Sequence, residues 1–146
     1  MMGFGIHLAT VVLLWMTALV PAERVPWGHT YQETAYAITE ACDEDIRCAA
    51  VLVAIGYHES RFDPAAVGDR GRSLGLFQVS TAWGAPSTIS EQARLARTLV
   101  ARSFAICRER PRGEALGWYC AGGVGCGRPA SSHVRMKLAA SLLGNP

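Results

Sequence analysis

The chain has no charged residue in its first 22 positions and no apolar run long enough to cross a membrane. The apolar stretch over residues 8–20 covers about thirteen positions, whereas a transmembrane helix needs roughly 20. Small side chains lead up to Ala22, so we expect residues 1–22 to be a signal peptide that is cleaved after Ala22. The mature chain is then secreted or periplasmic, without stable membrane insertion. A positively charged n-region is also missing, which leaves open a membrane anchor through residues 3–20.

The sequence also lacks the spacings that metal ligands need. None of the five cysteines forms a Cys-x-x-Cys pair, and His29, His58 and His133 are scattered along the chain. His58 and Glu59 would begin a zinc-protease motif, but that motif needs a second His four residues after the first, and the residue there is Phe62. We therefore predict no metal and no organic cofactor.

There is no internal repeat and no low-complexity linker after the leader. A length of 146 residues fits one domain, which we place at residues 23–146. Half of the residues are hydrophobic and 18% are charged, which excludes a disordered tail or a fibrous protein. We expect one folded domain with one core and one site, and a monomer.

Charge is unevenly distributed although the net charge is only +2. Residues 23–60 carry seven acids and two arginines, whereas residues 61–146 carry twelve bases and five acids. The basic half could attract a polyanion such as nucleic acid or a cell-wall polymer. The alternative is a solvated helix face rich in arginine. We favour that alternative for residues 94–112, so nucleic acid is not a predicted partner.

The hydrophobic pattern predicts a mainly α-helical domain. Capping boxes begin at Thr30 and Thr88, and the acids at 43–45 favour the start of another helix. Residues 48–57 are apolar on nearly every face, which is typical of a buried central helix. Any β structure should be a small ribbon in the glycine-containing loop over 63–75. The predicted helices are 30–41, 43 to before 63, 88 to before 111, 113–119 and about 132–143.

Five cysteines in an oxidising compartment predict disulfides. The simplest pairing joins Cys42 to Cys48 and Cys120 to Cys126, which leaves Cys107 unpaired. Five cysteines allow fifteen ways to make two bridges, so the sequence does not decide between them.

Glu59 is the residue on which a catalytic interpretation depends. It lies at the end of the apolar helix and before the glycine-containing loop. Burial would raise the pKa of its carboxyl, and a carboxyl that keeps its proton near neutral pH can act as a general acid. The structural alternative is a salt bridge between Glu59 and Arg61 or Arg72.

Three short blocks carry a resemblance to a known family. They are residues 59–67 (ESRFDPAAV), 75–78 (GLFQ) and 119–122 (YCAG). In this order they resemble the signature blocks of the lytic transglycosylase and goose-type lysozyme superfamily. Residues 68–71 (GDRG), leading into the second block, are similar to the goose-type branch in particular. The resemblance covers roughly residues 43–124 and implies a lysozyme-like fold, mainly α, with a cleft that binds peptidoglycan glycan strands.

The resemblance also implies a role for individual residues. Glu59 matches the catalytic acid, which protonates the oxygen that joins N-acetylmuramic acid to N-acetylglucosamine. Two residues, Phe77 and Gln78, match positions that line the cleft. The remaining matches are Ser60 and Ser73, where hydroxyls contact the sugar or the catalytic Glu, and Tyr119, where a phenol hydrogen-bonds that Glu. Ordinary core packing is the alternative for Tyr119, Phe77 and Trp118.

The chain departs from the family pattern at three positions. Cys120 stands where the third block usually has Asn, so the role of the Asn side chain is lost or replaced by a disulfide. Phe77 stands where Met is common. Ser80 stands where goose-type enzymes have a second carboxylate that orients water. Only Asp63 and Asp69 follow Glu59 closely, and Asp63 precedes Pro64 and is expected to cap or turn the chain, so Asp69 is the one plausible partner for Glu59.

Two reactions begin with the same protonation by Glu59. In the hydrolase route Asp69 orients a water. In the transglycosylase route the substrate's own N-acetyl group stabilises the positive centre and its C6 hydroxyl closes a 1,6-anhydro ring. With one water-orienting carboxylate missing, we favour the transglycosylase. A noncatalytic peptidoglycan-binding relative and a small disulfide-rich module that binds a protein are the remaining alternatives.

Overall fold

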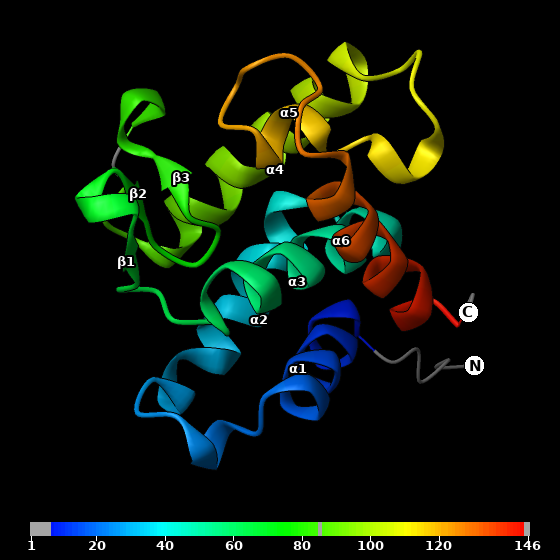
Figure 1. The fold of residues 1–146 in the computed structure, drawn as a ribbon. Coiled ribbons are helices and arrows are strands. Elements are labelled where there is room, and N and C mark those ends of the chain that lie inside the picture. The colour runs from blue at the N-terminus through cyan, green and yellow to red at the C-terminus, as the bar shows by residue number, and fades with distance from the viewer. Residues whose placement is uncertain (1–6, 85, 145–146) are drawn as a thin grey trace.

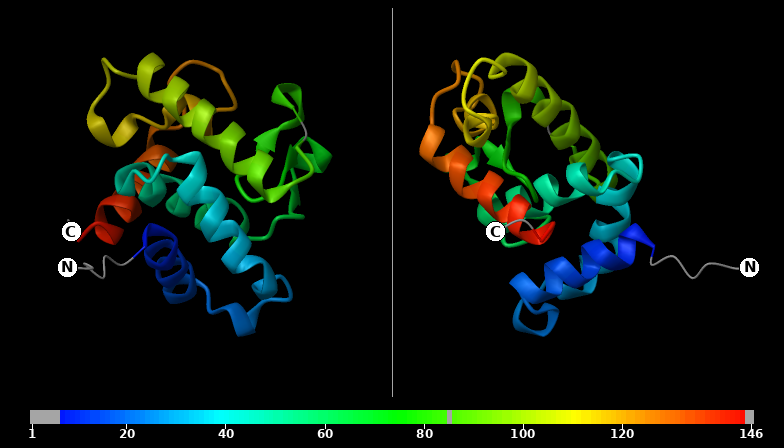
Figure 2. Two further views of the ribbon diagram at one scale, coloured as in Figure 1. Left: turned by 180° about the vertical axis from the view of Figure 1, so that it is seen from behind. Right: turned by 90° about the vertical axis from the view of Figure 1, so that its right-hand side faces the viewer.

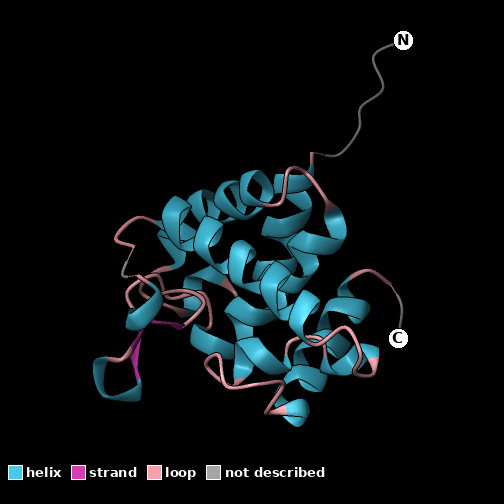
Figure 3. Cartoon of the chain, turned by 90° about the horizontal axis from the view of Figure 1, so that it is seen from above, coloured by secondary structure: helices cyan, strands magenta, loops and turns pink. Residues whose placement is uncertain are grey.

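The computed structural model describes residues 7–84 and 86–144, which form a mainly α-helical fold with one small antiparallel sheet (Figures 1 and 3). This confirms the predicted class of mainly α with a β-ribbon. The α-helices are α1 (Leu8–Leu19), α2 (Tyr31–Ala41), α3 (Ile46–Ser60), α4 (Ile89–Ile106), α5 (Gly117–Cys120) and α6 (Pro129–Leu142). The strands are β1 (Val67–Gly68), β2 (Ser73–Leu74) and β3 (Val79–Ser80).

Helix α1 lies in the segment that we predict to be a signal peptide, and it packs against α2 and α3 (Figure 2). Its side chains Val12 and Met16 are fully buried, and the Tyr31 hydroxyl donates a hydrogen bond of 2.8 Å to the Val20 carbonyl. Within the described residues, no helix is both long and apolar enough to cross a membrane. Residues 3–6 of the alternative anchor lie outside the described residues. Cleavage after Ala22 stays a prediction, and it would uncover the surfaces of α2 and α3 that α1 covers.

Helix α3 is the central helix of the domain, as predicted. Asp45 caps its N-terminus by accepting hydrogen bonds from the Arg47 and Cys48 amides, and every residue over 49–56 is buried. The helix ends because Arg61 and Phe62 both take the left-handed conformation, with φ of 52° and 68°. The Phe62 ring is fully buried against Gly56, where a Cβ would come within 3.3 Å of the ring. This reversal sends the chain from the end of α3 directly into the sheet.

The sheet has the order β1-β2-β3 with antiparallel neighbours, and Val67 pairs with Leu74 while Ser73 pairs with Ser80. The buried side chain of Gln92 joins this region to α4. Its Oε1 accepts from the Leu76 amide at 2.9 Å and its Nε2 donates to the Pro64 carbonyl at 3.1 Å. Because both loop groups are satisfied by one side chain, the loop that follows Glu59 is fixed to the helical body.

Two buried serines hold the segment that leads into α5. Ser103 on α4 donates to the Ala115 carbonyl and accepts from the Tyr119 amide, at 2.8 and 3.1 Å. Ser132 on α6 donates to the Gly113 carbonyl and accepts from the Leu116 amide, each at 2.8 Å. The predicted helix over 113–119 is therefore a 3-10 turn, Arg112–Glu114, followed by the short α5.

Several element boundaries differ from the prediction. Helix α3 begins at Ile46 and not at 43, and β3 lies beyond the loop 63–75 in which the ribbon is predicted. Thr30 does not cap α2, because it has helical dihedral angles and its hydroxyl donates to the Trp27 carbonyl at the end of a 3-10 turn. Helix α4 ends at Ile106, before the predicted stop at Pro111. Helix α6 begins at Pro129, which fits the first turn because proline has no amide hydrogen to leave unsatisfied. The Thr88 cap is present and accepts from the Glu91 amide.

One of the two predicted disulfides is wrong. Cys42 pairs with Cys48 as predicted, but Cys126 pairs with Cys107 and leaves Cys120 free. The end of α4 brings the Cα of Cys107 to 5.7 Å from that of Cys126, a separation that a disulfide spans without distortion. Cys120 instead belongs to α5 and lies on the side of Glu59.

Candidate active site

Glu59 lies on the last turn of α3 and forms an ion pair with Arg135 from α6. Arg135 Nη2 donates to Glu59 Oε1 at 2.7 Å, and the two side chains are 21% and 14% exposed for Glu59 and Arg135. Arg135 Nε is the one buried side-chain polar atom without a partner in the described part of the chain. Glu59 Oε2 has no hydrogen-bond donor among the described residues, and it is not one of the fully buried side-chain atoms.

Glu59 therefore forms a salt bridge, as the structural alternative predicts, but its partner is Arg135 and not Arg61 or Arg72. The Arg61 guanidinium lies over the Tyr57 ring, 5.3 Å from its centroid. Arg72 Nε donates to the Asp69 carbonyl at 3.2 Å. Neither forms an ion pair with Glu59 in the described part of the chain.

Burial raises the pKa of the Glu59 carboxyl above its ordinary value, and the negative charge of Asp69 adds to this rise. The Arg135 charge and its hydrogen bond act in the opposite direction and offset part of the effect. The net direction is upward. Glu59 thus combines the raised pKa expected of a general acid with an ion pair that favours its charged form.

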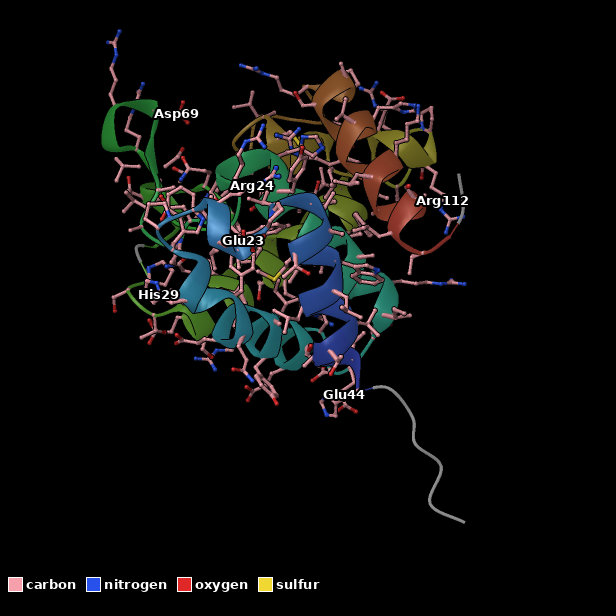
Figure 4. All side chains as sticks on the ribbon, turned by 90° about the horizontal axis from the view of Figure 1, so that it is seen from below. Glu23, Arg24, His29, Glu44, Asp69 and Arg112 are labelled. Carbon is pink, nitrogen blue, oxygen red and sulfur yellow. A yellow bond between two sulfur atoms is a disulfide. The ribbon has the colours of Figure 1, made fainter. Side chains whose placement is uncertain are left out.

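Asp69 stands on the turn between β1 and β2, which projects from the body of the molecule (Figure 4). It is exposed, with a left-handed backbone φ of 49°, and its Oδ2 accepts from the Ser73 hydroxyl at 2.6 Å. Its charge is near enough to Glu59 to influence the pKa of that carboxyl. Of the family-matched residues, Asp69 and Ser73 are thus brought together, on the side of Glu59 that faces the sheet.

Ser60 and Gln78 use their side chains to fix backbone. The Ser60 hydroxyl donates to the Leu76 carbonyl at 2.7 Å and accepts from the Asp63 amide. Gln78 Nε2 donates to the Ala66 and Gly75 carbonyls at 3.1 and 3.0 Å. Both side chains therefore hold the loop beside Glu59, and neither makes a hydrogen bond to Glu59 among the described residues.

Phe77 and Tyr119 belong to the hydrophobic core, which corrects the roles that the resemblance implies. Phe77 is 1% exposed and offers no surface to a cleft. The Tyr119 hydroxyl donates to the Phe77 carbonyl at 2.8 Å and does not bond Glu59. Burial, followed by the charge of Glu59, raises the pKa of Tyr119 well above its ordinary value. Tyr119 therefore joins α5 to the 75–78 turn beside the carboxyl.

Cys120 carries a free, partly buried thiol at the position where the family has Asn. Burial raises the pKa of this thiol to about 11, and the opposing charges of Arg135 and Glu59 both act on it. Cys120 is therefore a neutral neighbour of the ion pair. Its predicted disulfide does not form.

Arg135 could not be found from the sequence, because it lies 76 residues after Glu59 on a helix with no motif. A second unpredicted feature is the stack of Trp83 on Trp118, with ring centroids 5.0 Å apart and planes at 16°. Trp83 lies in the 3-10 turn after β3 and Trp118 in α5, so the stack joins that turn to α5.

No group of three or more His, Cys, Asp or Glu side chains is placed to hold a metal ion in residues 7–84 and 86–144. Two hollows in the surface, one at α2 and one between α3, α4 and α6, are not lined by Glu59. The glycan cleft at Glu59 stays a prediction. Comparison with protein-family models, with curated proteins and with solved structures finds no match to this chain.

Proposed function

We propose that this protein is a peptidoglycan lytic transglycosylase that cleaves the β-1,4 bond between N-acetylmuramic acid and N-acetylglucosamine. The observation that carries the proposal is the state of Glu59. Its side chain is partly buried, its pKa is raised, and one of its oxygens is held by Arg135 while the other accepts no hydrogen bond from the described residues. A positioned general acid needs these properties together.

The two carboxyl oxygens can take different parts in the reaction. Oε1 keeps the hydrogen bond from Arg135 and fixes the carboxyl, while Oε2 carries the proton. Oε2 gives this proton to the glycosidic oxygen as the bond from that oxygen to the anomeric carbon breaks. The carboxylate then takes the proton of the substrate's C6 hydroxyl, whose oxygen closes the 1,6-anhydro ring. One carboxyl thus serves as acid and then as base.

Hydrolysis is the second outcome of the same protonation. It needs a carboxylate that orients water, and Asp69 is exposed and coupled to Glu59. Its carboxylate already accepts from Ser73, and Ser80 is engaged as a cap through its hydrogen bond from the Ala82 amide. These contacts support the transglycosylase over the hydrolase.

The ion pair itself favours one further candidate, a noncatalytic relative that binds peptidoglycan. In such a protein the Glu59–Arg135 contact would only join α3 to α6. The two candidates differ in a measurable way, because a structural ion pair does not turn over substrate.

The test is the clearing of a suspension of purified cell walls by the full-length chain. Wild-type protein should clear the suspension, and Glu59→Gln should be slower by about 100-fold or more, because general acid catalysis contributes typically 10²–10⁴-fold. Glu91→Gln is the matched control, since Glu91 is an exposed glutamate on α4. Equal rates for wild type and Glu59→Gln would contradict the proposal. Mass spectrometry of the released fragments then separates a 1,6-anhydro end from a reducing end, which is heavier by one water.

The two disulfides fit an oxidising compartment outside the cytoplasm. Peptidoglycan lies in such a compartment, so we propose export of the protein to the periplasm or the cell exterior.

A further inference from the structure

A broad groove lies between the first half of α3, the second half of α4 and α6, with a volume of about 1130 Å³. Helices α4 and α6 each pack on α3 but barely contact one another, and this leaves the groove between them. Figure 2, right, looks onto this side of the molecule. The groove is lined with hydrocarbon from Val51, Val100, Phe104, Met136, Ala140 and Leu143.

Most of the cations that line this apolar groove have no ion-pair partner in the described part of the chain; the exception is Arg108, whose Nε lies 3.6 Å from Glu109 Oε1. Arg47, Arg97, Arg110, Arg112 and Lys137 line the groove, and none has a carboxylate within ion-pair distance among the described residues. The single acid in the lining is Asp45, which is engaged in capping α3. Positive side chains gathered around an apolar surface attract a ligand that carries a negative charge and also has an apolar part.

The rest of the lining narrows the class of ligand. It contains no Ser, Thr, Asn, Gln, Tyr or Trp side chain. The polar side chains of the lining are nearly all cations, so it offers few acceptors for the hydroxyls of a sugar. A ligand with one negatively charged head and a hydrocarbon chain needs only the cations and the apolar floor. The lining therefore fits a lipid-type amphiphile better than a glycan.

We propose that this groove binds an anionic lipid-type amphiphile, with its phosphate head at the arginines and its hydrocarbon chain along the floor. The groove is separate from Glu59. Val51 and Glu59 lie eight residues apart on α3, so about 12 Å of helix separates them. Figure 4 likewise shows Arg112 and Asp69 at opposite sides of the molecule. The proposal therefore does not depend on the glycosidic activity.

The experiment is isothermal titration of the full-length chain with dodecyl phosphate below its micelle-forming concentration. Dodecyl maltoside supplies the same chain with a neutral head, and inorganic phosphate supplies the head without a chain. We expect saturable binding of dodecyl phosphate and at least tenfold weaker binding of both controls. Arg97→Glu should weaken binding by about tenfold or more, because it replaces an attraction with a repulsion.

Arg94→Glu is the matched control, since Arg94 is exposed on the same helix, changes the net charge equally and does not line the groove. Ala101→Trp fills the groove from α4 and should also reduce binding, with thermal unfolding as a check that the variant folds. Equal losses in Arg94→Glu and Arg97→Glu would overturn the proposal. Binding of dodecyl maltoside or inorganic phosphate as tight as that of dodecyl phosphate would do the same. Binding only to phosphatidylglycerol vesicles would assign the cations to a membrane surface and would refute the groove site.

Discussion

Replacement of Arg135 by Gln separates a working general acid from a structural salt bridge. The change removes the positive charge that pairs with Glu59 Oε1 at 2.7 Å and leaves an amide of lower bulk. The Arg135 charge and hydrogen bond lower the pKa of Glu59, whereas burial raises it, so their loss lets the pKa of Glu59 rise further. Glu59 would then keep its proton to higher pH.

The energy at stake follows from the geometry of the pair. Two unit charges about 4 Å apart interact by about 1 kcal/mol in a water-like medium and by about 4 kcal/mol at an effective dielectric constant near 20. The side chains are 21% and 14% exposed, so the pair belongs between these limits. We expect Arg135→Gln to lower the free energy of unfolding by about 2 kcal/mol at neutral pH.

The pH dependence has a definite sign. Glu59 in the folded chain has a pKa above its unfolded value, so the folded state binds more protons and stability falls as pH rises between the two values. In Arg135→Gln that fall is larger and extends to higher pH. Denaturant unfolding should show the smallest difference from wild type below the ordinary Glu pKa of 4.5 and the largest near neutral pH.

The pH dependence of activity on cell walls is the second readout, because a purely structural role for Arg135 would leave the shape of the pH–rate profile unchanged. The alkaline limb of the pH–rate profile should shift to higher pH in Arg135→Gln, since the acid stays protonated longer. Arg135→Lys, which restores a positive charge, should return the limb toward the wild-type position.

A double-mutant cycle with Glu59→Gln isolates the coupling between the two side chains. We expect a coupling of about 1–3 kcal/mol at neutral pH that shrinks as Glu59 is protonated. A coupling that does not change with pH, together with an unshifted rate profile, would refute the assignment of Glu59 as a general acid under the control of Arg135.

Two further predictions concern the surroundings of the site. Gln92→Leu should lower the free energy of unfolding by about 2–4 kcal/mol in denaturant titration, because it leaves the buried Leu76 amide and the Pro64 carbonyl without partners; a loss below about 1 kcal/mol would contradict the proposed link. Under nonreducing conditions a maleimide should label only Cys120, slowly in the native protein because its pKa is about 11, and rapidly after unfolding. Peptide mapping that places the label on Cys107 would contradict the observed pairing.

The elements of the fold follow closely from the sequence because their signals are local. The unbroken apolar stretch over 48–57 predicts the buried central helix, and the Thr88 cap predicts the start of α4. The first two strands lie in the predicted loop 63–75, where glycines break helical periodicity, whereas β3 over 79–80 lies outside it. The predicted cap at Thr30 is absent for a local reason too. A 3-10 turn precedes α2, so Thr30 already has helical dihedral angles and its hydroxyl donates to the Trp27 carbonyl.

The candidate site was predictable only in part, because its contacts join distant segments. Glu59, Asp69 and Ser73 lie near one another in the sequence, and the structure places their charges and hydroxyl in one region. Arg135 belongs to a helix whose rotation about its axis decides which residue faces Glu59, and no short pattern encodes that rotation. The pairing of Cys107 with Cys126 depends in the same way on where α4 ends.

Arg135 changes what Glu59 can do without excluding the proposed chemistry. A carboxyl that is buried without a partner would be protonated over a wide pH range but free to rotate, whereas one locked by two donors would give up its proton. Here one oxygen is held by the guanidinium and the other has no protein donor among the described residues, while burial still outweighs the arginine in setting the pKa. The contact therefore fixes the direction in which Oε2 presents its proton. The loss of fixation and the rise in pKa act oppositely on the rate, so Arg135→Gln should be slower than wild type at acidic pH and approach it as pH rises.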